Sequence, residues 1–239
     1  MNKIFHYGHE NLTVAKTIAL SQGKMQGIFL PSVVEKIKKS AQDVQDIVDS
    51  KRTVYGVNTG FGILANKTIS ETDTLTLQYK ILQSHSVGVG QAIPREIAKI
   101  MLITKVQALA QGFSGVQLST LERLLWHIDR DIVPVVPEKG SVGASGDLAP
   151  LSHLCLPLIG LGQVWYRGEI LPAAQVLESE GLAPVQLGPK EGLALINGTQ
   201  FILSFAVKAV ERFFHCLEIA DIIGAMSLES LQGTKAPFD

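Results

Sequence analysis

Residues 199–231 carry the longest helical pattern in the sequence, and this run limits the possible folds more than any other stretch. Its apolar side chains recur every three or four residues without a clear break, from Phe201 to Ile223. That spacing places them on one face of a helix. A helix in a globular protein usually spans roughly 8–20 residues, so a longer one indicates a helical bundle or a subunit interface. We therefore expect an all-α protein.

Shorter helices are predicted before this run. Residues 32–35 and 119–122 have the spacing of a capping box, in which a serine begins a helix and a glutamate follows three residues later. The expected helices cover residues 13–21, 32–50, 70–87, 94–111, 121–128, 148–159 and 172–178, and residues 163–171 are expected to form a small hairpin. In the helix over 94–111, the side chains expected near the buried face are Ile97, Ile100, Met101, Ile103, Thr104 and Ala108.

Composition excludes several classes of partner. The 21 basic residues against 22 acidic ones include no basic run, so no nucleic-acid partner is expected. No uncharged apolar run approaches the ~18 residues of a membrane span, and residues 1–9 lack the apolar core of a signal peptide. We therefore expect a soluble, cytoplasmic protein. Cys155 and Cys216 lie in apolar helical patterns and are expected to be buried and reduced. The histidines show no ligand spacing beyond His6 and His9, and no metal is expected.

Residues 140–150, GSVGASGDLAP, form a glycine-rich stretch whose composition is typical of a tightly folded backbone. Glycine permits positive φ and close backbone approach, so the amide nitrogen of Gly146 can meet the carbonyl carbon of Ala144. Bond formation between them with loss of water would make an imidazolone ring. Loss of the Ser145 hydroxyl as a second water would leave an electrophilic methylidene carbon.

The residues of this loop leave a second interpretation open, a turn in which Asp147 caps the following helix. They disfavour a nucleophile elbow, because Asp147 stands where the GxSxG pattern requires glycine. They also disfavour a phosphate loop, because Gly-Lys-Ser/Thr does not occur in the sequence.

Three further motifs accompany the loop: YGVNTGFG at 55–62, SHSVGVG at 84–90 and NGTQ at 197–200. Together with GASGDLAPLSH at 143–153, they resemble in order and spacing the aromatic amino-acid ammonia-lyases, and the histidine ammonia-lyase branch in particular. The resemblance runs through all 239 residues but covers only the N-terminal half or so of the family chain. It implies that Ala144, Ser145 and Gly146 cyclise to 4-methylidene-imidazol-5-one (MIO), with no external cofactor.

The resemblance also implies a base and a histidine that recognises the substrate ring. Residues 55–62 match the family's lid over the active site, and Tyr55 matches the tyrosine that removes the substrate β-proton. A free tyrosine has a pKa of about 10, so this role requires surroundings that favour the phenolate. Ser84 and His85 match the pair that reads the substrate ring in the histidine branch. From the residues alone, Tyr55 can equally anchor a surface loop, and His85 can be a favourable cation at a helix C-terminus.

Asn197 and Leu193 complete the implied site. Asn197 matches the family asparagine that hydrogen-bonds near the ring and the substrate carboxylate, and Leu193, one helical turn earlier, is expected to line the ring pocket. The residues alone allow Asn197 to be a helix cap. His153 is expected to be a satisfied core histidine rather than a triad partner of Ser145, because the elbow pattern fails.

The implied activity is elimination of ammonia from L-histidine to give urocanate. Alternatives within the family are a tyrosine or phenylalanine ammonia-lyase or an aminomutase, which the Ser84-His85 pair disfavours. The alternative outside the enzymes is a truncated, non-catalytic chain that acts as a scaffold or interaction partner.

The resemblance also implies an organisation into two parts. An MIO-bearing domain is expected over residues 1–198, with short strands and loops around the active-site loop, and the start of a central helical bundle over 199–239. Family members form homotetramers, and a homo-oligomer is therefore expected. Because further catalytic residues belong to the family's second half, the isolated chain is expected to have negligible activity.

Overall fold

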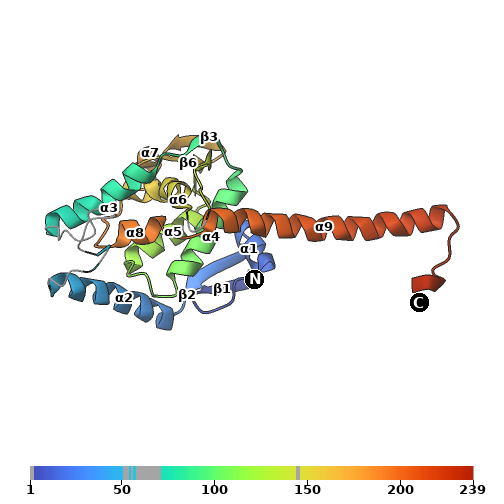
Figure 1. The fold of residues 1–239 in the computed structure, drawn as a ribbon, viewed down its shortest axis with the longest axis horizontal. Coiled ribbons are helices and arrows are strands. Elements are labelled where there is room, and N and C mark those ends of the chain that lie inside the picture. The colour runs from blue at the N-terminus through green and yellow to red at the C-terminus, as the bar shows by residue number, and fades with distance from the viewer. Residues whose placement is uncertain (1–2, 51–53, 55, 58–70, 144–145, 239) are drawn as a thin grey trace.

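The structure, a computed structural model, describes residues 3–50, 54, 56–57, 71–143 and 146–238. Helices dominate it, and the expected all-α class is confirmed (Figure 1). The helices are α1 (Val14–Ser21), α2 (Pro31–Asp49), α3 (Glu71–His85), α4 (Arg95–Leu109), α5 (Leu118–Asp129), α6 (Leu148–Cys155), α7 (Ala173–Ser179), α8 (Glu191–Ile196) and α9 (Gln200–Ser230), with 3₁₀ helices η2 (Leu156–Ile159) and η3 (Ala236–Phe238).

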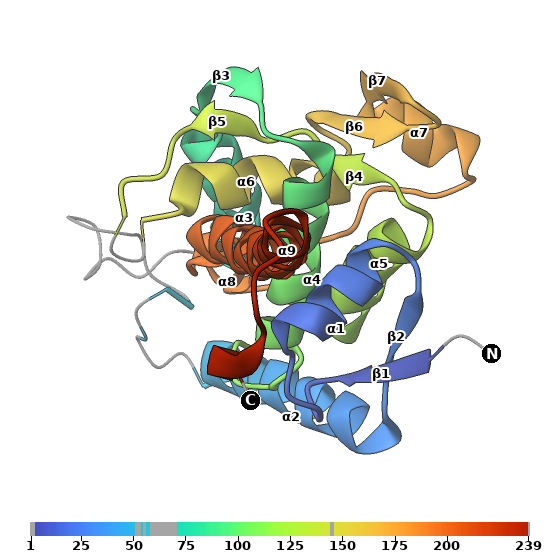
Figure 2. The ribbon, with the colours of Figure 1, turned by 90° about the vertical axis from the view of Figure 1, so that its right-hand side faces the viewer.

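Short strands lie around this helical body (Figure 2). The strands are β1 (Lys3–Tyr7), β2 (Met25–Phe29), β3 (Val89–Ala92), β4 (Val133–Pro134), β5 (Pro137–Lys139), β6 (Gln163–Tyr166) and β7 (Glu169–Pro172). β1 and β2 pair in parallel, β3 and β5 pair antiparallel, and β4, β6 and β7 form a three-stranded antiparallel sheet. The expected hairpin at 163–171 is confirmed as β6 and β7.

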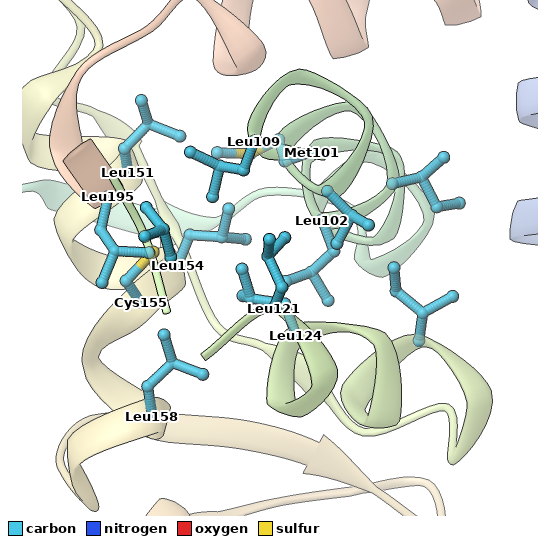
Figure 3. Close-up of a cluster of buried hydrophobic side chains, with 14 of the residues drawn as sticks. Met101, Leu102, Leu109, Leu121, Leu124, Leu151, Leu154, Cys155, Leu158 and Leu195 are labelled. Atoms are coloured by element: carbon cyan, nitrogen blue, oxygen red, sulfur yellow. The ribbon is translucent and has the colours of Figure 1, made fainter. Parts of the chain in front are cut away.

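Helix α4 lies at the centre of the body and packs against α1, α5, α6 and α9. Every residue from Ile97 to Val106 is buried, because the helix is enclosed on all sides. Its apolar side chains meet those of α5, α6 and α8 in one cluster (Figure 3). The cluster includes Met101, Leu102, Leu109, Leu121, Leu124, Leu151, Leu154, Cys155 and Leu195. The prediction that Ala108 lies near the buried face is wrong, because it is exposed on the outer side of the last turn of α4.

The long helix α9 leaves this body after its first two turns (Figure 1). Its buried residues are Gln200, Phe201, Ser204 and Val207. Beyond them it carries exposed apolar side chains at Phe213, Phe214, Leu217, Ile222, Ile223 and Met226. Although α9 is long, none of the helices in the described part of the chain is both long and apolar enough to cross a membrane. The domain boundary between residues 198 and 199 stays a prediction.

Two expected capping boxes are wrong. α2 begins at Pro31, which suits the first helical position because its φ is fixed, and α5 begins at Leu118. Ser32 and Ser119 therefore lie inside the first turn, and the N-cap residue of neither helix makes a side-chain capping bond. Before α5, the backbone N–H of Gln117 donates instead to Glu191 Oε1 at 2.8 Å. The N-cap residue of α5 is thus held by Glu191, which is distant in sequence.

The two cysteines differ in their surroundings. Cys155 is buried, as expected, whereas Cys216 is exposed on the projecting part of α9. The prediction for Cys216 is wrong because the apolar pattern around it lies beyond the turns of α9 that reach the core. Both cysteines are free thiols.

Candidate active site

The glycine-rich loop joins β5 to α6, and its base is tightly packed. Val89 of β3 lies opposite Lys139 of β5, so the loop starts beside the segment that follows α3. At Gly140 the backbone passes close to Gly88 and to the first turn of α6, and a Cβ at this position would crowd Ala149. The pairing therefore brings the segment after His85 to the entrance of the loop.

Within the loop, two hydrogen bonds fold the backbone back on itself. The N–H of Gly146 donates to the carbonyl of Gly143 at 2.5 Å, and the N–H of Val142 donates to the carbonyl of Gly146 at 3.1 Å. A Cβ at Gly146 would collide with the Gly143 carbonyl and the Val142 side chain, so this position requires glycine. Ala144 and Ser145 lie outside the described residues.

Asp147 closes the loop and caps a distant helix. Its side chain is fully buried; Oδ1 accepts from Ser141 Oγ at 2.6 Å, and Oδ2 accepts from the backbone N–H groups of Phe201 and Ile202 at 3.0 and 3.1 Å. Thr199 is the N-cap of α9, so these are the donors that an N-cap side chain normally satisfies. Asp147 stands at the N-cap position of α6 but makes no capping bond there. The expectation that it caps the following helix is therefore wrong.

The segment around Asn197 lies against the loop. Gly146 and Gly198 form an isolated parallel β-bridge between the two segments. Asn197 is the exposed C-cap residue of α8, and its Nδ2 donates to the carbonyl of Leu193 at 2.8 Å. Leu193 is half-buried against the main core. The helix-cap role that the sequence left open for Asn197 is thus observed.

Lys105, which no sequence motif singles out, hydrogen-bonds to the backbone of the same segment. It lies in α4 and is 1% exposed, and its Nζ donates to the carbonyls of Ala194 and Asn197 at 2.9 and 2.7 Å. Burial lowers its pKa to about 8 and raises the pKa of the neighbouring Cys155 thiol to about 12. A lysine spaced four residues from both Met101 and Leu109 was the available signal, because that spacing places it on their buried face.

His85 ends α3 and has a defined ring orientation. Its Nδ1 lies 2.9 Å from the carbonyl oxygen of Ile81 and 3.1 Å from Ser84 Oγ. Because a carbonyl oxygen only accepts, Nδ1 carries the hydrogen in this bond. In the neutral ring Nε2 is then an acceptor.

His153 of α6 holds the segment that follows His85. Its Nε2 accepts from the backbone N–H of Gly88 at 3.0 Å, and its ring is half-buried. Burial lowers the pKa of His153, which favours the neutral ring that can accept this bond. His153 is satisfied at Nε2, as expected, but its ring is half-buried and does not belong to the core.

The described site therefore joins several of the predicted residues. Gly146 meets the Asn197 segment directly, and His85 is linked to the same region because Gly88 binds α6 and α3 packs against α8. Tyr55 lies outside the described residues, as do residues 58–62 of its motif.

Comparison with known proteins agrees with this arrangement. A family profile described as aromatic amino acid lyase matches residues 12–239. The chain belongs to the aromatic amino acid lyase family. It is 39% identical over 239 residues to histidine ammonia-lyase of Streptococcus pyogenes serotype M3 and 38% identical to that of Streptococcus sanguinis, covering 47% of each. The chain thus spans about half the length of the curated relatives it matches.

Solved structures of the aromatic amino acid lyase family share the fold. Histidine ammonia-lyase from Trypanosoma cruzi is 35% identical with a TM-score of 0.88, over 98% of this chain and 45% of that one. Tyrosine aminomutase from Streptomyces globisporus is 33% identical with a TM-score of 0.90, over 98% and 44%. The predicted family resemblance is confirmed.

Proposed function

We propose that this chain carries an active site for the elimination of ammonia from L-histidine, which gives urocanate. The observation that carries the proposal is the bridge between Gly146 and Gly198, which holds the glycine-rich loop against the Asn197 segment. Support for histidine as the substrate comes from the similar histidine ammonia-lyases and from the ring orientation of His85.

The loop fits an MIO group made from Ala144, Ser145 and Gly146. The hydrogen bond from the Gly146 N–H to Gly143 turns the Gly146 nitrogen back toward the preceding residues, and only glycine is accommodated at this position. Such a group would supply an electrophile for the substrate amine, which would make ammonia a better leaving group. No external cofactor is proposed.

Other residues of the chain take the proton and hold the substrate. Tyr55 removes the β-proton as the C–N bond breaks, so the proton goes to its phenolate and ammonia leaves. The exposed Asn197 amide hydrogen-bonds near the substrate carboxylate, and its bond to the Leu193 carbonyl fixes its orientation. Leu193 borders the pocket that holds the MIO ring.

His85 recognises the imidazole of the substrate. Because its Nδ1–H donates to the Ile81 carbonyl, the neutral ring offers Nε2 to an N–H of the substrate imidazole. A phenyl ring has no such donor, so the same position discriminates against phenylalanine.

The intact mass of the purified protein tests the internal electrophile. A deficit of two waters is expected, together with near-ultraviolet absorbance from the conjugated methylidene. Ser145→Ala should abolish both, because no hydroxyl remains to leave as water. An unmodified wild-type mass would remove the MIO group from the proposal, and a deficit that survives Ser145→Ala would show that it arises elsewhere.

His85→Leu is expected to lower kcat/KM for histidine about 100-fold more than for phenylalanine, because a polar ring loses its partner while an apolar ring gains a compatible wall. Steady-state kinetics on both substrates measure this ratio in a form of the protein that is active to begin with, since the isolated chain is expected to have negligible activity. Equal losses on the two substrates would mean that His85 is structural and would favour a tyrosine- or phenylalanine-specific enzyme.

The proposal includes a cytoplasmic homotetramer. Support for self-association comes from the exposed apolar side chains that α9 carries beyond Val207, since large exposed apolar surfaces mark interaction sites. Sedimentation measurements on the protein should give a mass above that of a monomer. A monomer at micromolar concentration would contradict this part of the proposal.

A further inference from the structure

We infer that Lys105 is a positioning residue that fixes the backbone segment against which the glycine-rich loop is held. The inference deepens the proposed function, because it concerns how the chain prepares the site for ring formation. The hydrogen bonds of the Lys105 ammonium in the described residues go to the carbonyls of Ala194 and Asn197, so it acts on the loop through the Asn197 segment.

The contacts of Lys105 are those of a helix cap contributed by another helix. The carbonyls of the last turn of a helix have no partner within the helix. At the end of α8, two such groups, the carbonyls of Ala194 and Asn197, both accept from Lys105 Nζ. A cation at a helix C-terminus also interacts favourably with the helix dipole. The Lys105 ammonium therefore holds the point where α8 ends and the chain turns toward Gly198.

A short path leads from this point to the proposed ring. Asn197 is followed at once by Gly198, and Gly198 forms the bridge to Gly146. Among the described residues, the Asn197 side chain bonds to the carbonyl of Leu193 in α8, and this bond does not link α8 to another element. Lys105 supplies a link at this end of α8, because its position in α4 is set by the core on all sides.

Burying the Lys105 ammonium costs free energy unless hydrogen bonds replace its lost hydration. Within the described residues, its ammonium is bonded to no carboxylate, and the nearby Cys155 thiol is neutral because burial raises its pKa. An unpaired buried charge destabilises a fold, whereas an apolar side chain of similar length would pack here without that cost. Lys99 in the same helix contrasts with it, since its Nζ pairs with Asp131 Oδ1 at 2.7 Å. What lysine adds at position 105 is the pair of bonds to α8.

Lys105→Met and Lys99→Met form a matched pair that tests the inference. Both changes remove a buried ammonium from α4, but only the first removes bonds to the Asn197 segment. In hydrogen exchange, amides of residues 194–198 should exchange about tenfold faster in Lys105→Met, as expected for loss of a charge-assisted hydrogen bond. The fraction of protein with the two-water deficit should also fall. Lys99→Met should leave both measurements close to wild type.

The two readouts separate this inference from the proposed function. A wild-type protein without the mass deficit would refute ring formation, yet hydrogen exchange would still decide the role of Lys105. If Lys105→Met exchanges at 194–198 as Lys99→Met does, the inference is overturned. Should Lys105→Met fail to fold, Lys105→Arg decides: a guanidinium keeps the charge and the donors, so protection near wild type supports the inference and lost protection contradicts it.

Discussion

Asp147→Ala is expected to lower the free energy of unfolding by about 3 kcal/mol, because it removes a buried carboxylate that accepts three charge-assisted hydrogen bonds. Two of these bonds come from the first-turn N–H groups of Phe201 and Ile202, and the third comes from Ser141. Alanine would leave the buried N–H of Phe201 and the part-buried N–H of Ile202 without this acceptor. Because the same carboxylate closes the glycine-rich loop, we also expect the two-water mass deficit to be largely lost.

Urea denaturation of Asp147→Ala and Ser141→Ala, read by circular dichroism, measures this effect. Ser141→Ala removes one of the three donors and leaves the α9 cap in place, so a loss of only about 1 kcal/mol is expected. A loss for Asp147→Ala no larger than that for Ser141→Ala would show that the α9 cap contributes little.

Helical periodicity predicted most of the fold. The expected helices at 13–21, 32–50 and 199–231 agree with α1, α2 and α9 to within one residue at each end. Such segments are predictable because each presents a local pattern, in which apolar spacing and flanking glycine or proline agree. The first residue of a helix is harder to predict, because a capping box spans only four residues and other contacts can satisfy the same donors.

The candidate site was predictable only in part, because its hydrogen bonds connect residues distant in sequence. The glycine-rich loop and the Asn197 motif are visible as sequence patterns, but the bridge between Gly146 and Gly198 depends on the packing of α8. Likewise, Asp147 stands at the N-cap position of α6, but its side chain accepts hydrogen bonds from the first turn of α9. Lys105 carries no motif, and its partners in α8 become apparent only when the helices are packed.

Gly192 marks the contact on which the relative placement of His85 and Asn197 depends. Here α8 crosses α3, and the N–H of Gly192 donates to Gln78 Oε1 at 3.0 Å. A Cβ at Gly192 would collide with the Gln78 backbone and the Ile81 side chain. The two helices can therefore approach this closely only because position 192 has no side chain.

Gly192→Ala is accordingly expected to force α3 and α8 apart and to lower the free energy of unfolding by about 1–3 kcal/mol, the usual effect of overpacking a core. His85 lies at the end of α3, and Asn197 lies at the end of α8, so their separation should change with the helices. A displacement of about 1 Å in a positioned group can reduce rate about 100-fold, and we expect kcat/KM for histidine to fall by that order.

Gly224→Ala is the matched control, because it makes the same change in α9 where a Cβ would meet no atom within 4 Å. Alanine is the better helix former, so this variant should gain about 0.5–1 kcal/mol in the free energy of unfolding of the chain. Chemical denaturation compares the two variants, and steady-state kinetics compare Gly192→Ala with the wild type in a form of the protein that is active to begin with. If Gly192→Ala matched Gly224→Ala in stability and the wild type in kcat/KM, the close approach of α3 and α8 would not determine the geometry of the site.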